Sequence, residues 1–77
     1  MKKYQCHKIV KAMKISAIEI TVNGSVTLTG EDGYEILVSA SWLEKHEPKI
    51  GGYYVRYEDG YSSWSPAGAF ESGYTEI

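Results

Sequence analysis

Residues 18–38 read IEITVNGSVTLTGEDGYEILV, and this stretch decides the fold class. Apolar and polar side chains alternate along it, which is typical of strands with one buried face. Asn23-Gly24 favours a tight two-residue hairpin turn, because both residues tolerate the left-handed backbone that such a turn requires. Residues 31–33, Glu-Asp-Gly, favour a second turn. The stretch therefore predicts an antiparallel meander whose last strand covers residues 34–38.

More strands are expected on both sides of the meander. Residues 4–15 alternate apolar residues with lysines, and we interpret them as one long strand that is partly buried on both faces. Residues 53–58 and 61–64 flank Asp59-Gly60, which is a preferred hairpin pair. Residues 74–77 form a candidate terminal strand.

Two short helices interrupt this pattern. Ser41 and Glu44 fit a capping box for the first helix, and Pro48 ends it early. Ser65-Pro66 favours the start of a second helix, and Gly73 favours its end. The predicted fold class is α+β: a small antiparallel sheet of about five or six strands, formed by a β-meander and a C-terminal hairpin, with two short helices.

The length of 77 residues and the net charge of -2 bound the possible functions. One domain, residues 1–77, is expected, with a small core and little room for a deep active site. The single cysteine excludes an internal disulfide and favours an intracellular protein. No apolar run approaches the roughly 20 residues that a membrane span needs, so a soluble protein is expected.

Charge is divided unevenly along the chain. Residues 1–14 contain five lysines and no carboxylate, whereas residues 15–77 contain all ten carboxylates and three basic side chains. The basic start could steer an anionic partner. The alternative is that its lysines pair with acidic neighbouring strands. The acidic remainder argues against binding to a long nucleic acid.

No group of residues points to catalysis. Cys6 and His7 are adjacent, and adjacent side chains on a strand point to opposite faces, so they cannot act as a nucleophile–base pair. Nothing in the sequence requires His46 to approach Cys6. These three residues also lack the spacing of a structural zinc site. We therefore expect no enzyme activity, no metal site and no cofactor.

Aromatic side chains are the better candidates for binding. Four of the seven tyrosines lie in residues 53–61, beside the only arginine, Arg56. A sheet face with tyrosines and one arginine could stack a planar ligand and hold a phosphate. The alternative is that the rings form the core of a domain with few other large side chains. The predicted ligand-binding residues are His7, Tyr53, Arg56 and Tyr57.

Two segments carry a resemblance. YQCHK at residues 4–8 and GGYYVRYEDGYSSWSPAGAFESGYT at residues 51–75 resemble a family of small proteins encoded by tailed phages and prophages. Residues 16–50 have no counterpart in that resemblance. The resemblance implies a setting, the cytoplasm of the infected host cell, and it implies no reaction or catalytic residue.

In that setting we expect an accessory protein that acts by stoichiometric binding, as a homo-oligomer. The first hypothesis is that it counteracts host defence by sequestering a nucleotide-like immune signal. The alternatives are an inhibitor that binds a host defence protein, a structural or morphogenetic phage protein, and, last, a small enzyme that uses Cys6 or His7. Membrane association is not expected.

Overall fold

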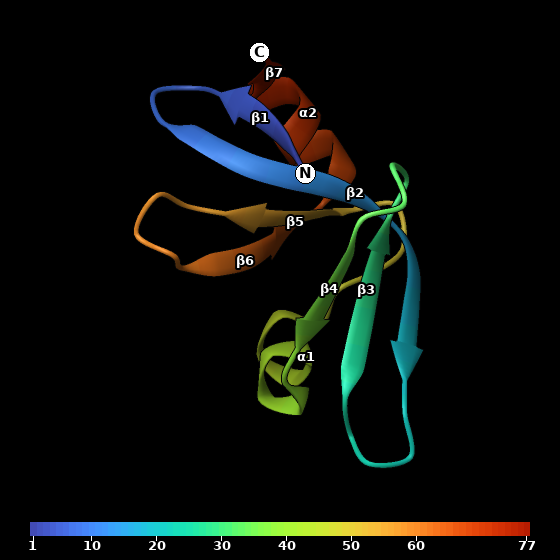
Figure 1. The fold of residues 1–77 in the computed structure, drawn as a ribbon. Helices are drawn as coiled ribbons and strands as arrows, with labels where there is room; N and C mark the ends of the chain where they lie inside the picture. Colours follow the sequence, from blue (N-terminus) through green and yellow to red (C-terminus); the bar gives the residue numbers. More distant parts are fainter.

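The computed structural model describes residues 1–77 as seven strands and two short helices (Figure 1). All strand pairings are antiparallel, which confirms the predicted α+β class. Neither helix has the length or the apolar composition to cross a lipid bilayer. In chain order the elements are β1 (Lys2–Gln5), β2 (Ile9–Ile20), β3 (Val26–Gly30), β4 (Glu35–Val38), α1 (Ala40–His46), β5 (Tyr53–Arg56), β6 (Ser62–Ser65), α2 (Ala67–Gly73) and β7 (Thr75–Glu76).

The long strand β2 belongs to two groups of strands. Its first half pairs with β1 on one side and β5 on the other, and β7 and β6 extend this group at its two edges. Its second half pairs with β3, which pairs with β4. The register shifts between Ile15 and Ala17, and such a bulge bends a strand. Figure 1 shows β2 curving from the upper group of strands into the lower one.

The chain reverses where one long strand was predicted. The interpretation of residues 4–15 as a single strand is wrong, because β1 ends at Gln5 and β2 begins at Ile9. The backbone N–H of Cys6 donates to the carbonyl of Lys8 at 3.1 Å and closes the turn between them. This turn contains no glycine, proline or asparagine, so it carries none of the residue types that mark a turn in a sequence.

The meander is confirmed. The first hairpin lies where it was predicted, but its loop has three residues, because the N–H of Thr21 donates to the carbonyl of Ser25 at 2.9 Å. Only Gly24, with φ 87°, has the left-handed backbone that was expected of both Asn23 and Gly24. Gly33 has φ 86° in the second predicted turn. These angles lie in the left-handed region, which glycine adopts without a steric cost.

The predicted helix starts need correction. Ser39 caps α1, because its Oγ accepts from the N–H of Trp42 at 3.0 Å, whereas the predicted cap, Ser41, lies inside the helix. Ser39 has the extended backbone of a cap, and its position three residues before Trp42 suits the bond. The helix ends before Pro48, as predicted. At α2 the cap is Pro66, without a side-chain bond, and Ser65 ends β6.

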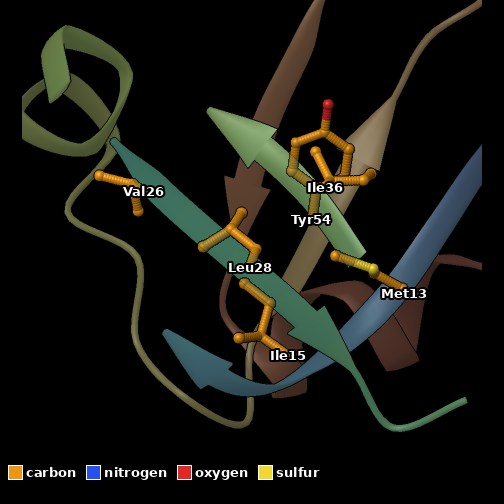
Figure 2. Packing of buried hydrophobic residues seen from close by; sticks show 6 residues of the cluster. All are labelled: Met13, Ile15, Val26, Leu28, Ile36 and Tyr54. Carbon is orange, nitrogen blue, oxygen red and sulfur yellow. The ribbon is translucent and has the colours of Figure 1, made fainter. Parts of the chain in front are cut away.

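Buried side chains form two clusters, one on each face of the β2–β5 pair. The first lies between the two groups of strands (Figure 2) and is flanked by Trp42 and Leu43 of α1 and by Trp64 of β6. Its members are Met13, Ile15, Val26, Leu28, Ile36 and Tyr54. Gly52 is buried beside it, and a Cβ there would lie 2.3 Å from the Trp64 Nε1.

The second cluster lies under α2. Phe70 of this helix is 1% exposed and packs on the opposite side of the same two strands. Its ring stacks on Tyr53 at 4.2 Å and on Tyr74 at 4.4 Å between centroids. The remaining buried members are Val10, Ala12 and Val55. The core is therefore thin, and the sheet between the clusters is covered differently on its two sides.

Candidate functional site

The strands β1, β2 and β5 present two faces that differ in charge. We call the side covered by α2 the helix face, and the opposite side, where it extends beyond the first buried cluster, the open face. Alternation along β2 places Ala12 and Lys14 on the helix face and Ile9 and Lys11 on the open face. The same alternation along β1 places Lys2 on the helix face and Lys3 on the open face.

Three cations stand side by side on the open face. Lys3 of β1 is paired in register with Lys11 of β2, which is paired with Arg56 of β5. Residues directly opposite each other across a strand pair have Cβ atoms about 5 Å apart and share a face. We call Lys3, Lys11 and Arg56 the basic row.

No carboxylate neutralises the basic row. None of its three side chains has a carboxylate oxygen within 4.0 Å. The Arg56 guanidinium carbon lies 5.7 Å from the centre of the Tyr54 ring, and its Nη2 lies 3.5 Å from the Tyr54 hydroxyl. Arg56 is half-buried, whereas Lys3 and Lys11 are exposed. The expected pairing of lysines with acidic neighbours is therefore absent here.

The helix face has the opposite arrangement. The Lys14 Nζ lies 3.4 Å from Glu71 of α2, and the Lys2 Nζ lies 3.7 Å from Glu76 of β7. The Tyr53 hydroxyl donates to Glu71 at 2.8 Å. This bond, followed by the contact with Lys14, lowers the pKa of Glu71.

Two hollows adjoin the basic row. One, of about 350 Å³, includes all three cations together with Ile9, Tyr57 and Glu58 in its lining. The other, of about 620 Å³, lies beside it and is lined by Lys8, Ile9, Tyr57, Glu58, Asp59 and Tyr61. The rings of Tyr57 and Tyr61 stack at 5.9 Å. Both hollows are open to solvent, which suits docking better than enclosure of a small molecule.

The structure brings together only two of the four predicted ligand-binding residues. Arg56 and Tyr57 line the same hollow. Tyr53 is 6% exposed and belongs to the cluster under α2, so its ring is part of the core. His7 is exposed in the turn between β1 and β2 and lines neither hollow. A stacked planar ligand that uses all four residues is not compatible with this arrangement.

The cysteine and histidines are not assembled into a catalytic group. Cys6 is exposed in the turn after β1, and the nearby backbone N–H of Lys8 lowers the pKa of its thiol. His46 is in α1, which Figure 1 shows at the opposite end of the view from that turn. Burial against Trp42 and Tyr61, followed by the charge of Lys45, lowers the pKa of His46. No three side chains converge as metal ligands.

Sequence reasoning missed Lys3, Lys11 and Ile9 as members of a site. Lys3 meets Lys11 only because the chain turns at residues 6–8, and that turn was not recognised. Given the turn, pairing of Gln5 with Ile9 fixes the pairing of Lys3 with Lys11 two positions further out. The available signal was the concentration of five lysines in residues 1–14.

The fold resembles the solved structure of a phage protein. No family model and no curated protein matches the sequence. The fold matches the NMR solution structure of the monomeric form of the phage L decoration protein, with a TM-score of 0.70 and 30% sequence identity. The match covers 88% of this chain and 52% of that one, so the chain spans about half the length of its neighbour.

This likeness supports the phage setting that the sequence predicted, at the level of a phage protein. It leaves the two sequence motifs untested. The neighbour is a structural phage component, not an enzyme. Among the predicted functions, the likeness supports the structural or morphogenetic alternative better than the first hypothesis, and nothing supports sequestration of a nucleotide-like signal.

Proposed function

We propose that this chain is a non-enzymatic binding module that attaches to a protein on the surface of a phage particle. The observation that carries the proposal is the 30% identity to the phage L decoration protein over 88% of this chain. Identity of that size over nearly the whole chain adds to the agreement in fold, which by itself would say little about function.

The geometry is consistent with attachment to a protein. The open face combines exposed cations with half-exposed apolar and aromatic side chains, and protein interfaces use this mixture. Both hollows are too open to bury most of a small ligand. The proposal also includes localisation to the cytoplasm of the host cell and self-association into a homo-oligomer.

The test is the composition of purified particles. Virions induced from the host that carries the gene are purified through a density gradient and analysed by quantitative mass spectrometry. We expect the chain at a fixed ratio to the major coat protein, and we expect purified chain to bind again to particles stripped of it. Recovery of the chain only in the soluble fraction of the lysate would refute attachment and favour an accessory role in the cytoplasm.

A further inference from the structure

The basic row lowers the stability of the fold that contains it. Like charges directly opposite each other on neighbouring strands are unfavourable. Lys11 takes part in two such pairs, with Lys3 on one side and Arg56 on the other. The fold thus keeps an unfavourable arrangement on the face that α2 leaves uncovered.

The chain has carboxylates that neutralise lysines elsewhere. Glu76 and Glu71 pair with Lys2 and Lys14, which are neighbours of the basic row in sequence and lie on the helix face. The only carboxylate that lines the same hollow as the basic row is Glu58, and it forms no ion pair. The missing counter-charge therefore has to come from solvent ions or from a partner.

An apolar and aromatic surface continues from the basic row. Ile9 is 41% exposed and lines both hollows, and Tyr61 is 50% exposed at the rim of the larger one. A cationic row beside partly exposed apolar side chains suits a segment that carries both carboxylates and an apolar side chain.

Carboxylates fit this surface better than a phosphate backbone. Glu58 and Asp59 line the larger hollow, so a nucleic acid that followed the basic row would bring its next phosphates against negative charge. A protein segment can instead place its carboxylates on the three cations and an uncharged side chain in the hollow.

We propose that the basic row and the adjoining hollows are the docking surface for an acidic segment of a protein partner, with its carboxylates on Lys3, Lys11 and Arg56 and an apolar side chain against Ile9 and Tyr61. This inference deepens the proposed function, on which it rests, by naming the face that attaches and the chemistry that the face recognises.

The first experiment uses a defined probe. A fluorescent synthetic peptide of six glutamates and one leucine is titrated with the full chain at low and at moderate salt. The test variant combines Lys3→Gln, Lys11→Gln and Arg56→Gln, and the matched control combines Lys2→Gln, Lys14→Gln and Lys49→Gln. Both variants lose three positive charges, and the control loses them outside the basic row, two of them from the ion pairs with Glu76 and Glu71.

We expect the wild-type chain to bind the peptide, with an affinity that falls as salt rises. The test variant is expected to bind at least about tenfold more weakly, and the control within about threefold of wild type. Equal losses in both variants would overturn the proposal, because net charge and not the basic row would then explain binding. Absence of wild-type binding would overturn it as well.

Thermal unfolding of the same variants separates docking from a structural role. Because the basic row has no internal counter-charge, the test variant is expected to melt at the same temperature as wild type or higher. A midpoint about 5 °C or more below that of wild type would assign the basic row to the fold and overturn the proposal.

Two further measurements distinguish a protein partner from a nucleic acid, and failure of the docking surface from failure of the proposed function. Tighter binding to a single-stranded DNA of matched charge than to the peptide would replace the acidic protein segment by a nucleic acid. If wild type and the test variant bind purified particles equally, the docking surface is wrong and the proposed function stands. If the chain binds the peptide through the basic row but no particle, the proposed function fails and the chemistry of the surface stands.

Discussion

The two faces of the β1–β2–β5 sheet contain similar residues in opposite arrangements. On the helix face, Lys2 and Lys14 each have a carboxylate partner, and Phe70 covers the strands between them. On the open face, Lys3 and Lys11 have none, and the arginine that stands beside them adds to their charge. The difference teaches that the fold itself supplies counter-charges and an apolar cover to the helix face, whereas the cations of the open face are available to a partner.

The largest expected effect comes from removing the aromatic side chain that covers the helix face. Phe70→Ala should lower the free energy of unfolding by about 3–5 kcal/mol, because it creates a cavity among the rings of Tyr4, Tyr53 and Tyr74. In a domain of this size that loss is comparable with the whole stability. Chemical denaturation followed by tyrosine and tryptophan fluorescence measures it.

The matched change on the open face is Ile9→Ala, which should cost less than about 1 kcal/mol because the side chain is already 41% exposed. Similar losses for Phe70→Ala and Ile9→Ala would mean that the two faces contribute equally to the core.

The next effect concerns the edge of the first buried cluster, where Gly52 lies against Trp64. Gly52→Ala should lower the free energy of unfolding by about 1–3 kcal/mol, because the new Cβ would lie within 2.4 Å of indole atoms of Trp64. Gly68→Ala is the control: this position in α2 has open space, and alanine there should stabilise the helix by about 0.5–1 kcal/mol. Thermal melts of both variants should therefore shift in opposite directions.

Charge reversal at single lysines compares the faces directly. Lys11→Glu should raise the free energy of unfolding by a few tenths of a kcal/mol up to about 1 kcal/mol, because a carboxylate would replace the middle cation of the basic row. Lys14→Glu should lower it by a similar amount, because it would place two carboxylates where the ion pair with Glu71 stands.

Both shifts should shrink when salt is raised, since the side chains are partly exposed. Denaturation at two salt concentrations checks this. Destabilisation by Lys11→Glu would show that the basic row has an attractive partner within the fold.

The smallest expected effects are changes of stability with pH on the helix face. The pKa of Glu71 is lowered from its ordinary value of 4.5, so its folded form holds the proton less tightly than the unfolded form. The associated stability is therefore present above pH 4.5 and is lost as the pH falls through the lowered pKa. Glu71→Gln should remove this part of the acid dependence, which is measured by denaturation between neutral pH and acid.

At alkaline pH, stability is expected to fall as the pH rises. Burial, followed by the contact with Cys6, raises the pKa of Tyr74 from 10.0 to about 12, so the folded form holds this proton more tightly. The stability linked to Tyr74 is present below pH 10.0 and is lost as the pH rises towards 12. The pKa values of Tyr4 and Tyr53 are raised as well, so titration of tyrosine absorbance should show several late components, of which Tyr74→Phe removes one.

Local patterns predicted the elements that depend on neighbouring residues. Asn23-Gly24 and Asp59-Gly60 specify their hairpin turns locally. Gly24 and Gly60 have φ 87° and 90°. The Oδ1 atoms of Asn23 and Asp59 accept from backbone N–H groups two residues further on. Pro48 and Gly73 marked the ends of the helices for the same local reason. The turn at residues 6–8 escaped because tertiary pairing, not residue type, makes it.

Some residues of the candidate site could also be predicted from local sequence, and others depended on the tertiary structure. Arg56 and Tyr57 were found because an arginine among tyrosines is visible in the sequence, and they do line one hollow. Tyr53 was assigned to the same site, although alternation along β5 turns it towards α2 and into the core. Whether a tyrosine on a strand binds a ligand or belongs to the core depends on which element covers that face of the strand. For Tyr53 this element is α2, which is distant in sequence.

The sequence by itself determined a small α+β domain with an antiparallel meander, two short helices and an excess of lysine at its start, because turn chemistry, alternation and composition act locally. Only the tertiary structure decided which lysines are neutralised. That choice depends on which strands lie side by side and on which face a helix covers, and both are set by burial of apolar residues such as Phe70 from distant segments.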